Sequence, residues 1–440
     1  MSMAPVVPTL SKSADYVKRD TDNLSPSYTR SYPFVMDHGR GSEVWDVDGR
    51  RYIDFTTGIA VTNTGHCHPA VVEAIKSQAD KFLHMSGTDF YYPSQIELAE
   101  RLNALAPISG GTRVFFTNSG AETIEAAMKL ARYSTGRTRY LAFYGAFHGR
   151  TFGALSLTAS KTVQRRGFAP LVPGVSHAIY PNPFRNPWPG LEPGQAALDY
   201  IEERLFKTAV PPDEVAAIIV EPIQGEGGYI IPPPNFLPGL RDICDRHGIL
   251  LVLDEIQSGM GRTGKLFACE HWGVQPDILC LAKGIASGMP LGAIVARSEI
   301  MSWPPGSHAS TFGGNPISCA AALATLDLLL DGGMMAMATA SGEYAMKRLW
   351  EMAARYPQIG DVRGKGLMIG VELVKNRESN EPDPTLRNVV IEKAFQHGLL
   401  LIGCGPNGVR IVPALNIPRN HLDEGLELFD RSLAEALEEI

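Results

Sequence analysis

Apolar residues recur every three or four positions over 69–83 (PAVVEAIKSQADKFL) and 93–105 (PSQIELAERLNAL), a spacing typical of helices with one apolar face. Beyond them, short apolar runs alternate with helical patterns. The runs are RVFFT, RYLAFY, AAIIVEP, ILLVLDE, DILCLAK and LGAIVA. Continuous apolar strands separated by helices predict an α/β fold, with a mostly parallel sheet covered by helices on both faces. Ligands of such sheets bind at the carboxyl ends of the strands.

The two ends of the chain have different patterns. The first forty residues are polar and rich in Pro and Gly, which predicts an extended arm rather than a packed domain. Asp48-Gly49 lies between alternating runs and predicts a hairpin. After Pro316 an apolar helix leads through Gly332-Gly333 into a second lobe of helices and short strands. We therefore expect an arm and part of a small α+β domain over 1–65, a large domain over 66–325 and the rest of the small domain over 326–440.

Composition excludes several classes of protein. The 440 residues include 40 basic and 47 acidic side chains, a net charge of −7, without a Lys/Arg-rich block, so nucleic acid is not an expected partner. Six cysteines stand apart without a CxxC pair, which argues against disulfides and structural zinc. The alternate histidines of His66-Cys67-His68 lack further ligands, so no metal is expected. With neither a signal-peptide pattern nor a membrane-length apolar run, the sequence predicts a cytosolic protein without membrane attachment.

The segment FFTNSGAETIEAAMK places Asn118, Ser119, Gly120 and Ala121 between a strand and a helix. The first N–H groups of a helix and its dipole attract anions, and glycine permits the close approach of a phosphate. Ser119 with Glu122 three residues later also fits a capping box, which needs no ligand. The residues alone leave both alternatives open.

Two further strand ends carry charged side chains. Asp254 and Glu255 end the run ILLVLDE, where a carboxylate requires a partner for its desolvation; a pyridinium nitrogen or a buried salt bridge would serve. Lys283 ends DILCLAK, where burial would lower its pKa and favour Schiff-base formation, unless its amine simply reaches solvent. A phosphate cradle, an anionic strand end and a lysine in one sheet together match an aldehyde cofactor with a phosphate and a pyridine nitrogen.

The segment Gly259–Gly264 matches the GxGxxG pattern of dinucleotide-binding proteins. In those proteins the first glycine follows a strand directly and opens a helix, whereas here DEIQS intervenes. A glycine-rich loop at the active site is the better interpretation. Two alternatives do not involve such an aldehyde cofactor: a nicotinamide-dependent oxidoreductase and a non-catalytic binding protein.

At these residues the chain closely resembles the class III aminotransferases, which are fold type I pyridoxal-phosphate enzymes. The resemblance covers about nine-tenths of the chain. Its motifs are WDVDGRRYIDF, GIAVTNTGHCHP, TNSGAETIEAAMKLAR, GAFHGRT, EPIQGEGG, LDEIQSGMGRTG, LAKG, TFGGNP, GDVRGKGLMIGVEL and VRIVPALN.

The resemblance implies a set of cofactor residues. Lys283 would bind pyridoxal phosphate as a Schiff base and then move the proton between the carbons of substrate and cofactor. Asp254 would pair with the pyridinium nitrogen, and Gln257 would bind near the phenolic oxygen. The phosphate would lie on Ser119, Gly120 and Ala121, and Phe147 would stack on the ring; His148 is a further cofactor-binding residue. Thr311 would reach the phosphate from a neighbouring subunit, so we expect a homodimer or a dimer of dimers.

The resemblance also implies substrate residues. Arg150 would hold a substrate carboxylate, and Arg410 would hold the α-carboxylate of glutamate or 2-oxoglutarate. Glu226 would neutralise Arg410 when an ω-amine occupies the site, although the two residues could also form a purely structural ion pair. Ile59 would form an apolar wall, and Glu221 of EPIQGEGG is a further substrate-binding candidate.

The leading hypothesis is an aminotransferase that moves the amino group of a 4-aminobutyrate-type ω-amino acid to 2-oxoglutarate. Transamination of ornithine or lysine is an alternative. A second alternative is an amino-acid racemase with the same cofactor, although Glu226 favours transamination.

Overall fold

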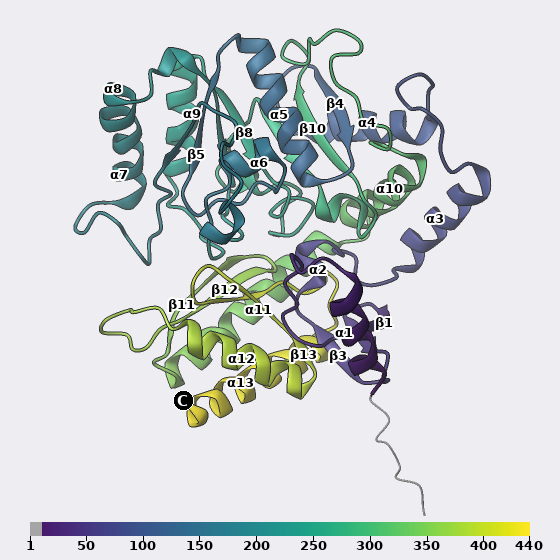
Figure 1. Cartoon of the computed structure of the whole chain (residues 1–440), viewed down its shortest axis with the longest axis vertical. Coiled ribbons are helices and arrows are strands. Elements are labelled where there is room, and N and C mark those ends of the chain that lie inside the picture. The colour runs from purple at the N-terminus through teal and green to yellow at the C-terminus, as the bar shows by residue number, and fades with distance from the viewer. Residues whose placement is uncertain (1–10) are drawn as a thin grey trace, which may run out of the picture.

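The structure is a computed structural model that describes residues 11–440. A seven-stranded sheet with the order β4-β10-β9-β8-β7-β5-β6 occupies the upper half of Figure 1. Its strands are β4 (Thr112–Thr117), β5 (Arg139–Phe143), β6 (Val175–Ala178), β7 (Val215–Val220), β8 (Leu250–Asp254), β9 (Ile278–Leu281) and β10 (Gly292–Arg297). All pairings are parallel except those of β10 with β4 and with β9. The carboxyl ends of the six other strands therefore lie at one edge of the sheet.

Helices cover both faces of this sheet. Along β8, Val252 packs in the same cluster as Ile124 of α5 (Gly120–Thr135), whereas Leu251 packs with Leu240 of α9 (Phe236–His247). The alternation follows from the two-residue repeat of a strand, which sends successive side chains to opposite faces. The predicted α/β fold, with a mostly parallel sheet between helices, is confirmed.

The remaining helices of the upper half surround these layers. They are α3 (Pro69–Lys81), α4 (Pro93–Leu105), α6 (Phe152–Leu157), α7 (Pro193–Asp199), a π-helix (Tyr200–Leu205) that runs on into α8 (Phe206–Thr208), and α10 (Pro316–Leu330). The bounds of α3 and α4 agree with the predicted helical periodicity, apart from two fewer residues at the end of α3. Both pack against α10.

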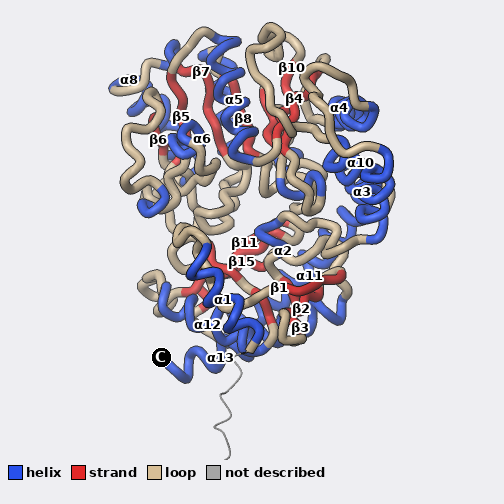
Figure 2. The backbone as a smooth tube through the Cα atoms, turned by 45° about the vertical axis from the view of Figure 1, so that its right-hand side comes forward, coloured by secondary structure: helices blue, strands red, loops and turns tan. Residues whose placement is uncertain are grey.

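Two four-stranded sheets lie in the lower half of Figure 1, and Figure 2 shows their strands in red. One has the order β1-β2-β3-β13, with β1 (Met36–Arg40), β2 (Glu43–Asp46), β3 (Arg51–Asp54) and β13 (Leu399–Leu400). The other has the order β11-β12-β15-β14, with β11 (Ile359–Lys365), β12 (Met368–Leu373), β15 (Gly408–Ile411) and β14 (Ile402–Cys404). The helices beside them are α11 (Met334–Arg355), α12 (Pro384–His397) and α13 (Arg419–Glu439).

Residues near the two ends of the chain build this lower half together. Strand β3 pairs with β13 in parallel, and Nη1 of Arg51 lies 2.7 Å from Oε1 of Glu424 on α13. The sequence predicts this arrangement in outline, but the boundaries proposed at residues 65 and 325 stay predictions. The hairpin at Asp48-Gly49 is confirmed, with Gly49 at φ 84° between β2 and β3.

The prediction that the first forty residues are extended is wrong over Lys12–Asn23, which form helix α1. Ser11 caps this helix, and the carboxylate of Asp48 accepts the N–H groups of Lys12 and Ser13 at 2.9 and 3.0 Å. No residue of α1 is buried, so its apolar content gives no strong signal in the sequence. The first ten residues of the predicted arm lie outside the described residues.

Among the described helices, none is by itself long and apolar enough to cross a membrane. Helices α10 and α11 meet that criterion only when taken together, with a bend of 63° between them.

Candidate active site

The charged side chains singled out in the sequence gather at the carboxyl edge of the large sheet. Asp254 is the last residue of β8, Glu221 follows β7, and Lys283 comes two residues after β9. The loop after β5 carries His148, and α5 begins three residues after β4 ends. Because these strands run in the same direction, side chains distant in sequence converge at one edge.

Asp254 and His148 form a buried pair. Oδ2 of Asp254 lies 2.7 Å from Nδ1 of His148, and its Oδ1 accepts the N–H of Ile256 at 3.0 Å. Burial acts to lower the pKa of His148, but the hydrogen bond and the charge of Asp254 raise it above its ordinary value. The N–H groups of His148 and Gly149 both donate to the hydroxyl of Thr158, at 2.9 and 3.3 Å, so the loop is fixed beside Asp254.

Lys283 occupies a strained position. Its φ of 46° lies in the left-handed region, which is uncommon for a residue with a side chain. Burial lowers the pKa of its amine below the ordinary value, although the charge of Asp254 opposes the shift. Backbone strain of this kind is concentrated at active sites, where the surrounding structure holds it in place. A partly buried, readily deprotonated amine at this edge is suited to nucleophilic attack on an aldehyde.

Glu221 adds a second buried carboxyl beside Asp254. Its oxygens accept the N–H groups of Phe147 at 3.2 Å and Gly225 at 3.0 Å. Burial raises its pKa to about 7, an effect that the nearby His148 opposes and Asp254 reinforces. Glu221 thus links the loop after β5 to the loop after β7.

The amino end of α5 forms an incomplete capping box. Ser119 accepts the N–H of Glu122 at 3.3 Å, but the carboxylate of Glu122 returns to the N–H of Asn118, at 2.8 Å, and not to that of Ser119. Among the described residues, the N–H groups of Ser119, Gly120 and Ala121 have no acceptor. A Cβ on Gly120 would lie 3.0 Å from the side chain of Ile256, so only glycine lets the loop approach so closely. Three free donors at a helix terminus fit an oxyanion such as phosphate.

Three charged side chains form a charged row at one side of this edge of the sheet: Lys161, Glu226 and Arg410. Oε2 of Glu226 lies 2.7 Å from Nη2 of Arg410, and its Oε1 lies 2.6 Å from Nζ of Lys161. Arg410 also donates to the carbonyl of Gly403, and its Nη1 is buried without a hydrogen-bond partner. Burial acts to raise the pKa of Glu226, but Arg410 and Lys161 hold it below its ordinary value. The predicted Glu226–Arg410 pair therefore exists, with a third member that the sequence did not indicate.

The other predicted residues of the large sheet lie around these groups. The guanidinium of Arg150 lies over the ring of Phe147, 5.5 Å from its centroid. Oε1 of Gln257 accepts the hydroxyl proton of Tyr229 at 2.6 Å, and Arg410 lies over the Tyr229 ring at 5.6 Å. Buried Tyr229 thus connects two predicted site residues, although nothing in its sequence context distinguishes it from a core tyrosine.

No hydrogen bond or ion pair among the described residues joins Ile59 or Thr311 to Lys283. Ile59 is exposed and has a φ of 67°, inside the short element α2 (Thr57–Ala60), whose four residues all have positive φ. Thr311 is exposed in the loop before α10, where the neighbouring Ser310 accepts a hydrogen bond from Asn118 at 2.8 Å. The roles proposed for Ile59 and Thr311 stay predictions.

Two residues in the same motifs have structural roles. Glu255, which the sequence places beside Asp254, accepts the N–H groups of Ala268 and Cys269 at 2.6 and 2.7 Å and so caps a 3₁₀ turn. Arg262 of the glycine-rich loop is fully buried and donates to Pro413 and Asn63. The loop lacks the strand–glycine–helix order of a dinucleotide site, in agreement with the sequence interpretation.

A cleft of about 810 Å³ lies elsewhere, between Pro232, Trp272 and Arg363, and none of the predicted site residues lines it. The active-site assignment therefore depends on the chemistry of the strand-end side chains.

These groups fit pyridoxal phosphate. The free N–H groups at the start of α5 match a phosphate, and Asp254 matches a protonated pyridine nitrogen. Nε2 of His148 is buried without a partner among residues 11–440, which leaves a polar atom for a bound group to satisfy. The Lys283 amine matches the aldehyde.

Comparison with known proteins agrees with this chemistry. The family described as aminotransferase class-III matches residues 25–433. The chain is 41% identical to an alanine/serine racemase of Pyrococcus horikoshii, over 97% of this chain and 91% of the relative. It is 38% identical to the 4-aminobutyrate aminotransferase of Escherichia coli, over 97% and 100%. A crystal structure of a PLP-bound amine transaminase from an uncultivated Pseudomonas species has a TM-score of 0.86 and 32% identity, over 94% of this chain and 98% of that chain.

The predicted fold type I architecture and the pyridoxal-phosphate cofactor are thereby confirmed. The chain belongs to the class III aminotransferases and is a pyridoxal-phosphate-dependent transaminase.

Proposed function

We propose that the enzyme transfers the amino group of a 4-aminobutyrate-type ω-amino acid to 2-oxoglutarate, giving a semialdehyde and glutamate. The observation that carries the proposal is the ion pair between Glu226 and Arg410, at 2.7 Å, beside Lys283. An arginine that is neutralised by a neighbouring carboxylate can bind a substrate carboxylate in one half-reaction. In the other half-reaction it stays paired with its neighbour and does not bind substrate.

The two half-reactions use the site differently. An ω-amino acid presents its amine to the site and its carboxylate lies at the far end of the molecule. Arg150 is exposed above Phe147 and would bind that carboxylate, while Glu226 stays on Arg410. Glutamate and 2-oxoglutarate carry an additional carboxylate next to the reacting carbon, and Arg410 would bind it once Glu226 moves aside. Ile59 and Glu221 remain proposed contributors to the substrate pocket.

The residues of the chain have separate proposed tasks toward the cofactor. Ser119, Gly120 and Ala121 would hold the phosphate. Asp254, which is hydrogen-bonded to His148, would pair with the pyridine nitrogen. Gln257 would bind the phenolic oxygen, and Phe147 would stack on the ring. Bound pyridoxal phosphate withdraws electrons from the substrate carbon that carries the amino group. Nζ of Lys283 would take the proton from that carbon and deliver it to the former aldehyde carbon of the cofactor, on the other side of the nitrogen. The lowered pKa of this amine supports its use as a base.

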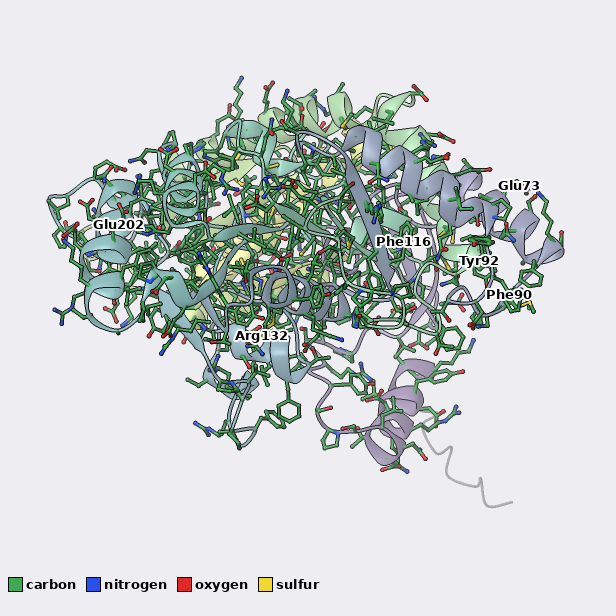
Figure 3. The ribbon with its side chains drawn as sticks, turned by 90° about the horizontal axis from the view of Figure 1, so that it is seen from above. Glu73, Phe90, Tyr92, Phe116, Arg132 and Glu202 are labelled. Carbon is green, nitrogen blue, oxygen red and sulfur yellow. The ribbon has the colours of Figure 1, made fainter. Side chains whose placement is uncertain are left out.

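We also propose that the active unit contains a second copy of the chain. Exposed apolar side chains are concentrated in the loop between α3 and α4, in the first turn of α4 and beside Thr311: Phe82, Leu83, Met85, Phe90, Tyr91, Ile96 and Phe312. The rings of His84 and Phe312 lie 4.8 Å apart, so these segments form one surface. Figure 3 shows Phe90 and Tyr92 at the end of the molecule opposite Glu202. An exposed apolar surface of this kind is typical of a subunit interface, through which Thr311 would reach the phosphate of the neighbouring copy. The cytosolic location stays a prediction of the sequence.

The 41% identity to an alanine/serine racemase supports a second candidate function, racemisation. A racemase returns the proton to the same carbon on the other face and needs no keto acid. Ornithine and lysine are alternative donors within the transaminase proposal.

One set of assays separates these functions. Purified enzyme is incubated with 4-aminobutyrate, ornithine or lysine, each with and without 2-oxoglutarate, and with L-alanine or L-serine alone. The proposal predicts glutamate from 4-aminobutyrate only when 2-oxoglutarate is present. Accumulation of D-alanine or D-serine without any keto acid, and no glutamate from the ω-amines, would identify a racemase instead.

A further inference from the structure

Lys161 is the one member of the charged row, Lys161, Glu226 and Arg410, that has no assigned role. Its Nζ lies 2.6 Å from Oε1 of Glu226, on the side opposite Arg410. The exposed fractions of the three side chains fall from 43% for Lys161 through 20% for Glu226 to 3% for Arg410. Glu226 therefore stands between a buried cation and one that faces solvent.

The segment just before Lys161 is hydrogen-bonded to the active-site loop. Ala159 donates to the carbonyl of Ala146 at 2.9 Å, and Gly145 donates to the carbonyl of Ala159 at 3.1 Å. Arg165 donates to carbonyls of the same segment, which include those of Leu155 and Ser156, at 3.2 Å each. These bonds fix the backbone that precedes Lys161, whose amine contacts Glu226.

Arg410 has a backbone acceptor besides Glu226, whereas the Glu226 carboxylate has only Lys161 and Arg410 as partners among the described residues. The guanidinium of Arg410 donates through Nε and Nη2 to the carbonyl of Gly403, at 3.2 and 2.7 Å. Glu226 stands between Gly225 and Gly227, in a turn that follows β7. A movement that frees Arg410 for a substrate carboxylate must therefore displace Glu226.

Lys161 supplies a partner for the Glu226 carboxylate when that carboxylate leaves Arg410. With Lys161 present, binding of a carboxylate to Arg410 leaves two neutral pairs, Lys161 with Glu226 and Arg410 with the substrate. Without it, the same event leaves Glu226 as an unpaired anion in a largely buried site, which is costly. While Glu226 remains on Arg410, its charge is already compensated, and Lys161 contributes less. The lysine therefore favours the state in which Arg410 is released.

We propose that Lys161 is a positioning residue for acceptor specificity, which receives the Glu226 carboxylate when a dicarboxylic substrate occupies Arg410. This inference rests on the proposed function and deepens it. The lysine would act through Glu226, without contact with the reacting atoms, and would lower the cost of binding 2-oxoglutarate or glutamate relative to an ω-amino acid.

The test uses the holoenzyme and glutarate, a dicarboxylate that has no keto group and cannot react. Calorimetry gives the Kd of glutarate for the wild type, Lys161→Gln, Lys161→Arg and the control Lys375→Gln, whose lysine pairs with Glu381 on the surface. We expect Lys161→Gln to raise this Kd about three- to fivefold, as removal of one charge from a pair whose lysine is largely exposed implies. The KM for 2-oxoglutarate should rise similarly and the KM for 4-aminobutyrate should change less than twofold. Lys161→Arg should restore the wild-type values, and Lys375→Gln should match the wild type.

Three outcomes would overturn the proposal. An unchanged glutarate Kd in Lys161→Gln would show that Lys161 is only a surface lysine. Equal losses in both half-reactions together with a lowered Tm would show a purely structural role. Failure of the wild-type holoenzyme to bind glutarate would contradict the proposed acceptor as well, and so would be distinguished from failure of the lysine's role alone.

Discussion

Nδ1 of His148 lies 2.7 Å from Oδ2 of Asp254, and both side chains are buried where β8 ends. The histidine gives the Asp254 carboxyl a hydrogen-bonding partner at a position where a buried polar group without one would be costly. The pair leaves Nε2 of His148 as a buried atom without a partner in the described part of the chain, beside the proposed cofactor site. Asp254 ends strand β8, and His148 comes from the loop after β5. The hydrogen bond between them fixes the position of both side chains.

The raised pKa of His148 predicts a pH-dependent contribution to stability. A histidine whose pKa is raised on folding stabilises the protein fully below its unfolded pKa, about 6.5, and loses that contribution as the pH rises through the folded value. The apoenzyme of His148→Gln should therefore unfold more easily than the wild type by about 3 kcal/mol at pH 5.5. Urea unfolding should show that this difference becomes smaller toward pH 9.

His177 is a matched control with the opposite sign. Burial lowers its pKa, so its contribution to stability increases as the pH rises. The difference between the wild type and His177→Gln should therefore grow with pH. If the two variants showed parallel pH profiles, the ion pair of His148 with Asp254 would not be the cause.

Ser119 is predicted to act both as a helix cap and as a phosphate ligand. Ser119→Ala should reduce the unfolding free energy of the apoenzyme by about 1 kcal/mol, the usual value of an N-cap. It should also weaken pyridoxal-phosphate binding about tenfold, as the loss of a hydrogen bond to a charged group implies. Equilibrium dialysis measures the affinity. Ser11→Ala removes the comparable cap of α1 and should leave the affinity unchanged; equal affinities for all three proteins would remove Ser119 from the phosphate site.

Glu226 and Lys161 should have opposite effects on the two half-reactions. Glu226→Gln leaves Arg410 without its neutralising partner, so binding of 4-aminobutyrate next to an uncompensated cation should become worse. We expect an increase of about tenfold in the KM for 4-aminobutyrate and an unchanged or lower KM for 2-oxoglutarate. Steady-state kinetics with each substrate varied in turn measures both. Equal effects on the two substrates would indicate a structural ion pair.

The strained element α2 gives a prediction about stability. Ile59 is exposed and holds a left-handed conformation that costs a β-branched residue about 1 kcal/mol or more. Ile59→Gly should therefore stabilise the apoenzyme or leave it unchanged in thermal unfolding. Ile96→Gly, at a similarly exposed position in α4, should destabilise it by about 1 kcal/mol. Comparable destabilisation by both substitutions would argue against strain at Ile59.

The sequence predicts the site best where a charge interrupts an apolar run. Asp254 is conspicuous because it ends an apolar strand, and Lys283 because it follows another apolar strand by two residues; the parallel sheet then brings them together. Glu255 has the same signature but caps a turn, since the direction of its side chain depends on the loop that follows. The pattern does not separate these two neighbouring carboxylates.

Residues outside such patterns cannot be found in this way. Lys161 lies in a polar loop, and its contact with Glu226 spans 65 positions along the chain. Tyr229 has the sequence context of a core residue, and α1 has too little buried surface to leave a hydrophobic pattern. The antiparallel direction of β10 cannot be predicted from its residues, because a buried apolar strand has the same composition in either direction.

The transfer of labelled nitrogen tests the central claim most directly. Enzyme is incubated with ¹⁵N-labelled 4-aminobutyrate and unlabelled 2-oxoglutarate, and the glutamate is analysed by mass spectrometry. We expect one ¹⁵N atom in each glutamate formed and an equal amount of succinic semialdehyde. Glutamate without the label, or no glutamate while alanine or serine racemises in the same preparation, would contradict that claim.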